Sequence, residues 1–139
     1  MPAAPRPGAP DLPVRPGEEP WTDAELAQVR KELEGEAIGL RADIDRATSQ
    51  IAERLSDSVA DAGDDQADAG TKAYEREHDL ALTQNARDLL DQTERALERM
   101  DAGTYGVCES CGKAIGKARL LAFPRAILCV ECKQREERR

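Results

Sequence analysis

The sequence predicts a mainly α-helical fold: a long antiparallel coiled-coil hairpin anchored to a small four-cysteine zinc-finger module with a short C-terminal helix. Apolar residues recur at heptad spacing in two long segments, and a stretch rich in glycine and aspartate separates them, which predicts the hairpin. The spacing of the cysteines predicts the module. Aromatic residues make up only 3% of the 139 residues and charged residues 35%, so a large globular core is not expected.

Residues 1–20 hold seven of the eight prolines, mixed with glycine, alanine and arginine. Proline fixes the backbone and removes a hydrogen-bond donor, so this composition predicts a disordered or polyproline-like tail. The segment has no apolar stretch of the kind found in secretory signals. No apolar run approaches the roughly 20 residues that a membrane span needs. We therefore expect a cytoplasmic protein.

The first long helix is predicted over residues 22–57. Thr22 as N-cap and Glu25 three residues later form a capping box, and Trp21 stands where a hydrophobic staple would begin. No proline interrupts the segment. From Leu33 to Ile51 its apolar residues alternate between steps of four and three, which is typical of a coiled coil: Leu33, Ala37, Leu40, Ile44, Ala47 and Ile51. Leu26 lies one heptad before this series, and Leu55 follows it by four residues.

A turn is predicted over residues 58–70, where Gly63 and Gly70 interrupt the heptads. Five aspartates and no basic residue lie between Arg54 and Lys72. This cluster could be a solvated acidic loop. At the end of a stiff arm, its carboxylates could instead reach a magnesium ion or a basic partner surface. The glycines favour an intramolecular hairpin over one long parallel dimer, so we expect a monomer.

The second helix completes a hairpin that spans residues 21–103. Thr71 is a candidate N-cap, Tyr74 is expected to pack near the start of the helix, and Gly103 is expected to end it. His78 is expected to be an ordinary helix residue. The predicted apolar positions are Leu82, Ala86, Leu89, Thr93, Ala96 and Met100, widened by Leu90 and Leu97.

All four cysteines fall in residues 104–139 and are arranged as C-x2-C-x17-C-x2-C: Cys108, Cys111, Cys129 and Cys132. Two pairs of thiolates, each on a tight turn, can complete the tetrahedron of one structural zinc ion. Gly112 suits such a turn because glycine tolerates a left-handed backbone. Four protein ligands leave no position for a substrate. Disulfides and a thiol redox switch are the alternative interpretations.

Charge is distributed unevenly along the chain, whose net charge is −8. Residues 1–70 carry a net charge of −9 and residues 113–139 a net charge of +5. Nonspecific duplex binding by the whole chain is therefore not expected. A nucleic-acid-binding zinc ribbon and a redox sensor remain alternative functions. An enzyme fits poorly, because no nucleophile–base pair or open metal position is evident. The nucleic-acid alternative would use Lys113, Lys117, Arg119 and Arg125.

Residues 103–112, Gly-Thr-Tyr-Gly-Val-Cys-Glu-Ser-Cys-Gly, resemble the DksA/TraR family of bacterial RNA-polymerase regulators. The resemblance extends over about residues 22–139. It implies a transcription regulator without catalysis, whose base sits at the polymerase rim and whose arm enters the secondary channel. The family's tip pattern, D-x-x-D-x-A, is matched here by Asp65 and Asp68 but ends in Gly70. Further matching positions are Ile115, Gly116, Arg119, Leu120, Ala122, Pro124, Ala126, Cys129 and Cys132.

The resemblance also bears on guanosine tetraphosphate, the alarmone of the stringent response, which some family members bind jointly with the polymerase. Gln92 and Phe123 align with positions that are basic in those members. Arg119 and Lys133 are retained as possible polymerase or phosphate contacts. Since phosphate binding requires cations, the resemblance implies weak or absent alarmone synergy.

Overall fold

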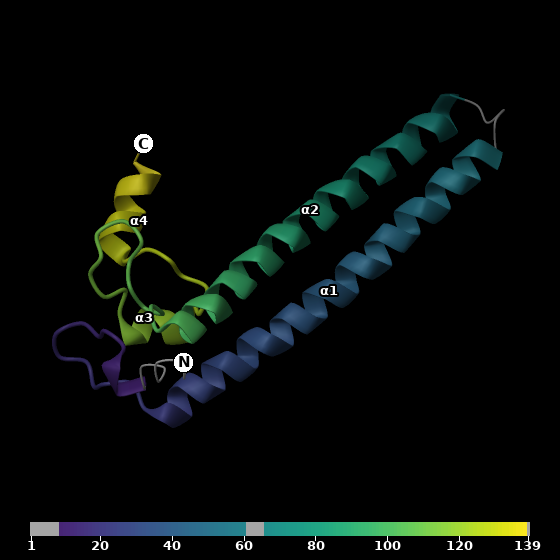
Figure 1. Ribbon diagram of the computed structural model, residues 1–139. Coiled ribbons are helices and arrows are strands. Elements are labelled where there is room, and N and C mark those ends of the chain that lie inside the picture. Colours follow the sequence, from purple (N-terminus) through teal and green to yellow (C-terminus); the bar gives the residue numbers. More distant parts are fainter. Residues whose placement is uncertain (1–8, 61–65, 139) are drawn as a thin grey trace. The chain divides into compact units, whose positions relative to one another are not determined.

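The computed structural model describes residues 9–60 and 66–138, except for the side chains of residues 57–60 and 66–69. A short 3₁₀ helix, η1 (Ala9–Asp11), precedes two long helices, α1 (Asp23–Ala60) and α2 (Gln66–Ala102). Two short helices follow, α3 (Lys117–Ala122) and α4 (Val130–Glu137) (Figure 1). Within the described ranges no helix is long and apolar enough to cross a membrane. The prediction of a mainly α-helical fold with two long helices is confirmed.

The chain divides into two compact units. The base comprises Met1–Gly35 and Gln92–Arg139, and the arm comprises Glu36–Asp91. The division falls within α1 and within α2, so both helices contribute to both units. The domain boundaries expected after residues 20 and 103 stay predictions.

Within each unit, α1 and α2 run antiparallel. In the base, the Arg30 guanidinium donates to an Asp101 carboxylate oxygen at 2.9 Å. In the arm, Arg54 pairs with Asp79. Early residues of α1 thus meet late residues of α2, and late residues meet early ones, as an antiparallel hairpin requires.

The start of α1 follows the predicted capping box. The Thr22 backbone N–H donates to Glu25 Oε1 at 3.0 Å, and the Glu25 N–H donates to Thr22 Oγ1 at 3.1 Å. Trp21 is fully buried in the core of the base, and Leu26 packs against that core. Sequence-local chemistry therefore sets the position of this helix start.

The predicted apolar stripe of α2 is wrong at Leu82, whereas Ala86 and Leu89 are half-buried. Leu82 is 54% exposed, whereas the neighbouring Thr83 is only 6% exposed. Thr83 can be buried because its hydroxyl donates to the Asp79 backbone carbonyl at 2.8 Å. Tyr74, expected to pack, is also exposed and stacks on His78. Five predicted stripe positions are buried: Leu33, Ala37, Thr93, Ala96 and Met100.

The turn between the long helices is shorter than predicted. Helix α1 continues to Ala60 and α2 begins at Gln66, so Thr71 lies inside α2 and is not its N-cap. Alanine is the best helix former, and an isolated Gly70 costs only about 1 kcal/mol inside a helix. Residues 61–65, including Asp65, lie outside the described part of the chain.

Residues 9–20, which lie in the predicted disordered or polyproline-like tail, pack on the base, and we call this segment the strap. Ala9 and Leu12 are 1% and 4% exposed and belong to the core of the base. Prolines restrict the unfolded chain, so a proline-rich segment loses less entropy when a few apolar side chains hold it. The first eight residues of the expected tail lie outside the described part.

A carboxylate fixes the strap to the start of α3. Glu18 accepts the Lys117 backbone N–H on Oε1 and the Ala118 N–H on Oε2, both at 2.9 Å. These are first-turn N–H groups that have no partner within the helix. The Lys117 ammonium in turn reaches Glu25 at 2.6 Å and lies over the Trp21 ring, 5.9 Å from its centroid. Strap, α1 and α3 thereby meet at one place.

We predict that Leu33→Ala lowers the free energy of unfolding by about 2–5 kcal/mol, because it leaves a cavity in the core of the base. Ile38→Ala is the control: Ile38 lies on the same helix but is largely exposed, and its loss should cost no more than about 0.5 kcal/mol. Urea denaturation followed by helical circular dichroism measures both variants. Equal losses would contradict the assigned helix face.

The contribution of Glu18 to stability should depend on pH. The Ala118 N–H holds the pKa of Glu18 below its ordinary value of 4.5 against the opposing effect of burial, with help from the backbone N–H groups of Arg15 and Lys117. A lowered pKa stabilises the folded state above the ordinary value, and this contribution is lost as pH falls through the folded-state pKa. Glu18→Gln should therefore be less stable than wild type at about pH 7, and the difference in stability should be smaller at about pH 3.

Denaturation at the two pH values tests this expectation. Glu19→Gln makes the same charge change at an exposed neighbouring position and serves as the matched control. A stability difference between wild type and Glu18→Gln that persists undiminished at the lower pH would show that the carboxylate charge is not the cause.

Candidate metal centre

Backbone hydrogen bonds shape the first cysteine turn. The Cys108 N–H donates to the Lys113 carbonyl at 2.8 Å, and the Gly112 N–H donates back to the Cys108 carbonyl at 2.9 Å. Gly112 has φ of +75°, the left-handed conformation predicted for it. Val107 and Ala114 form an antiparallel bridge just outside the turn. Cys108 and Cys111 are thus presented from one closed loop.

The second cysteine pair lies at the start of α4. Cys129 is the residue before the first turn, and Cys132 lies within that turn. The first turn of a helix favours negative charge and therefore favours a thiolate. The second pair of sulfurs is thus positioned by the ordered backbone at the start of α4.

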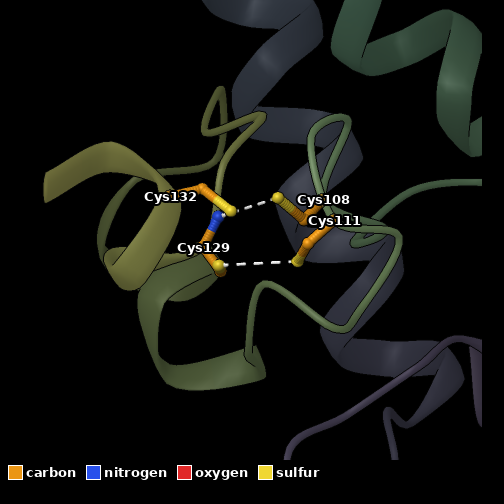
Figure 2. A group of neighbouring side chains, drawn as sticks. All are labelled: Cys108, Cys111, Cys129 and Cys132. Carbon is orange, nitrogen blue, oxygen red and sulfur yellow. Dashed lines mark hydrogen bonds between the residues drawn. The ribbon is translucent and has the colours of Figure 1, made fainter. Parts of the chain in front are cut away.

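Two hydrogen bonds join the cysteine turns. The Glu109 N–H donates to the Ile127 carbonyl at 2.9 Å, and the Cys129 N–H points at the Cys108 sulfur at 3.4 Å. Figure 2 shows the four sulfurs facing one another from the loop and from the start of α4. Residues from the two ends of a 17-residue connection are therefore brought into one cluster.

The geometry of the cluster fits a tetrahedral metal ion. All four sulfurs lie within 4.8 Å of one another, and those of Cys111 and Cys129 are 3.8 Å apart. Four sulfurs at about 2.3 Å from zinc would be about 3.8 Å apart. A disulfide would need about 2.05 Å, so this spacing fits a shared metal ion better than a disulfide. Cys111 is exposed, whereas the other three cysteines are buried.

The sulfurs differ in their affinity for a proton. Burial raises the pKa of Cys108, but N–H groups of Cys111, Cys129 and Ser110 outweigh it and bring the pKa to about 6. The pKa of Cys132 is raised to about 12, first by its hydrogen bond with Cys129 and then by burial. Thiolate is the form that binds metal, so Cys108 is better prepared than Cys132 to act as a ligand at neutral pH.

The other predicted site residues are not members of this cluster. Arg119 is half-buried, donates from Nε to the Leu128 carbonyl at 3.1 Å, and lies over the Phe123 ring at 5.6 Å. Lys133 is exposed on α4. Asp68 and the exposed Gly70 lie in α2. Arg119 therefore supports the connection to the second cysteine pair, a role that its sequence position does not reveal.

Two charged residues near the cluster were missed by sequence reasoning. Arg99, near the end of α2, pairs with Glu109, which lies between the first two cysteines. Glu18 binds α3 from about 100 positions away. Neither residue has a sequence signal for its partner, because charged residues are frequent throughout the chain. The cluster is thus connected to α2 and to the strap by contacts that only the fold reveals.

We predict about one zinc ion per chain in the purified protein, and its near-complete loss in Cys129→Ser, because three thiolates hold the ion less well than four. Loss of the metal should also lower the stability of the base, since metal binding contributes folding free energy. A colorimetric zinc assay combined with thermal denaturation measures both effects.

Lys113→Ala is the matched control, because the exposed Lys113 contributes only its backbone carbonyl to the cysteine turn. Full zinc content in Cys129→Ser, or equal zinc loss in Lys113→Ala, would contradict the assignment of the ligands.

Comparison with known proteins gives consistent matches. Residues 103–138 match the family model of the prokaryotic dksA/traR C4-type zinc finger. The RNA polymerase-binding transcription factor DksA of Escherichia coli (strain K12) is 33% identical over 119 residues, which are 86% of this chain and 76% of that protein. General stress protein 16O of Bacillus subtilis is 38% identical over 106 residues, 76% of this chain and 60% of that protein.

A solved structure extends the match to the fold. The transcription factor DksA2 from Pseudomonas aeruginosa superimposes with a TM-score of 0.69 at 32% identity, covering 84% of this chain and 85% of that one. The similarity therefore includes the long helices as well as the cysteine cluster. On these grounds the chain belongs to the DksA/TraR family of C4-type zinc-finger proteins.

Proposed function

We propose that this protein is a transcription regulator that binds RNA polymerase and has no catalytic activity of its own. The observation that carries the proposal is the similarity to the polymerase-binding factor DksA over 86% of this chain, which includes both long helices. A resemblance limited to the zinc finger would support only a shared metal site. Because RNA polymerase is its partner in this proposal, the protein would act in the cytoplasm. Because the two long helices pair within one chain, it would act as a monomer.

The four cysteines would hold one structural zinc ion in the base. A bound ion supplies cross-links that a core with few aromatic residues cannot provide. The residues that would hold the ion are Cys108, Cys111, Cys129 and Cys132, and they leave no position for a substrate. The base would then serve as the part that docks on the polymerase surface.

The acidic turn would act at the polymerase secondary channel. Asp68 lies in α2, two positions after the first residue of that helix. Asp65 precedes that helix, and Gly70 follows within it where the family pattern has alanine. Asp65 and Asp68 would perturb the active-site region and so change the lifetime of open promoter complexes.

Dependence on guanosine tetraphosphate would be weak. Phe123 is 61% exposed at a position that is basic in alarmone-binding members of the family, and Gln92 is neutral and exposed. Arg119 already donates to a backbone carbonyl and stacks on Phe123. A phosphate site built here would rely mainly on Lys133, and one cation binds a tetraphosphate poorly.

We predict that Asp65→Asn with Asp68→Asn leaves binding to core RNA polymerase nearly unchanged but abolishes the effect on transcription, because the base would dock while the tip would act. Co-elution of the zinc-loaded protein with polymerase measures binding, and open-complex lifetime on a set of promoters measures the effect. The matched control is Glu75→Gln with Glu77→Gln, two exposed acidic residues of α2.

Three results bear on the proposal. Loss of the transcription effect in the control pair would assign it to arm charge in general. An unchanged effect in the Asp65 and Asp68 variant would remove the tip from the mechanism. Absence of polymerase binding by the wild type, together with retention on DNA that weakens steeply with salt, would favour nucleic-acid binding instead.

A further inference from the structure

We propose that the strap is a latch for the metal centre: docking of residues 9–20 on the base and retention of metal by the four cysteines stabilise each other. The inference does not depend on binding to polymerase. It rests on where the strap makes its contacts, which is on the connection between the two cysteine pairs.

The first contact is the capping of α3. This helix lies within the 17-residue connection that joins Cys111 to Cys129. Glu18 accepts the first two N–H groups of α3, Lys117 and Ala118, at 2.9 Å each. Within the described residues, α3 has no side-chain cap from Gly116, the residue that precedes it. The strap therefore supplies a cap that the connection lacks.

The second contact is apolar. Ala9 and Leu12 of the strap belong to the same buried cluster as Leu120 of α3 and as Cys108 and Cys129. Leu120 is completely buried. Removal of the strap would expose apolar surface beside the sulfurs and would let water approach the metal ligands. The strap thus closes one side of the core that contains the cysteines.

The strap also approaches the backbone at both ends of the first cysteine loop. A Cβ built on Gly106 would lie 3.8 Å from the Pro13 carbonyl oxygen, and one on Gly116 would lie 3.2 Å from Arg15 Cδ. Arg15 further pairs with Glu131, between the second two cysteines, at 3.5 Å. That ion pair is largely exposed and should contribute little. Glu18 and Leu12 are therefore the residues that should carry the coupling.

These contacts lead to a reciprocal effect. With the strap docked, the connection is already ordered, so less conformational entropy is lost when the four sulfurs converge on a metal ion. Linkage then requires the metal to hold the strap by the same factor. Loss of zinc would release the strap, and weakening of the strap would increase zinc loss. Whether the cysteines hold a metal ion would thus determine whether the strap is docked on the base.

The first measurement is competition for Zn²⁺ between the full chain and a colorimetric chelator. Glu18→Gln and Leu12→Ala should each weaken zinc retention by about fivefold or more, a typical coupling between two sites. Glu19→Gln, which changes the same charge at an exposed strap position, should retain zinc like wild type. Helical circular dichroism of each zinc-loaded variant checks that α1 and α2 remain folded.

The second measurement uses the wild-type chain alone, so it does not depend on any variant folding. The N–H groups of Leu12 and Glu18 donate to Ala9 and Arg15 carbonyls within the strap, at 3.1 and 3.0 Å. Hydrogen exchange at these amides should accelerate on removal of zinc. The proposal is overturned if their exchange is unchanged by chelation, or if both folded variants retain zinc as wild type does.

Discussion

The packing of Trp21 against Tyr105 is the contact on which the base depends. Their ring centroids lie 6.1 Å apart in an edge-to-face arrangement, and both side chains are fully buried. Trp21 stands between the strap and α1, whereas Tyr105 stands between α2 and the first cysteine loop. The Tyr105 hydroxyl also donates to the Pro124 carbonyl at 2.9 Å, beyond the end of α3. In a chain with only four aromatic residues, two of them join most elements of the base.

Charged and polar side chains add further contacts around this small aromatic core. The ring of Trp21 lies beneath the Lys117 ammonium, which also pairs with Glu25 of the capping box. Arg30 and Asp101 then connect the two helices at the same end. Exposed ion pairs contribute little individually, but these share partners with a backbone cap and an aromatic ring. A connected set of polar contacts around the Trp21 and Tyr105 rings therefore fixes the arrangement of elements within the base.

Sequence reasoning succeeded where the determining chemistry is local. The Thr22–Glu25 box, the left-handed Gly103 and Gly112, and the two-residue spacing within each cysteine pair all involve neighbours in sequence. It failed at Leu82 and Thr83, because a threonine that donates to its own helix backbone can be buried while an adjacent leucine stays exposed. It also failed for the strap.

The strap illustrates a more general limit. Composition predicted a disordered or polyproline-like tail, yet a few apolar side chains and one carboxylate hold residues 9–20 on elements about 100 positions away. Local propensity carries no information on such a partner. The same limit applies to Arg99 with Glu109 and to Arg119 with the Leu128 carbonyl. The grouping of the four cysteines could be predicted from the sequence, whereas the contacts that support the cluster required the fold.

The contacts at the junction between α2 and the first cysteine loop restrict insertions and deletions in this part of the chain. The Thr104 N–H donates to the Arg99 carbonyl at 2.9 Å, and the Val107 N–H donates to the Thr104 carbonyl at 3.2 Å. The Arg99 side chain then pairs with Glu109. A single inserted or deleted residue between these positions would change the length of the junction and disrupt these three contacts. Insertions, deletions and inserted tags should therefore be tolerated poorly at this junction, because the number of residues between Arg99 and Glu109 is constrained.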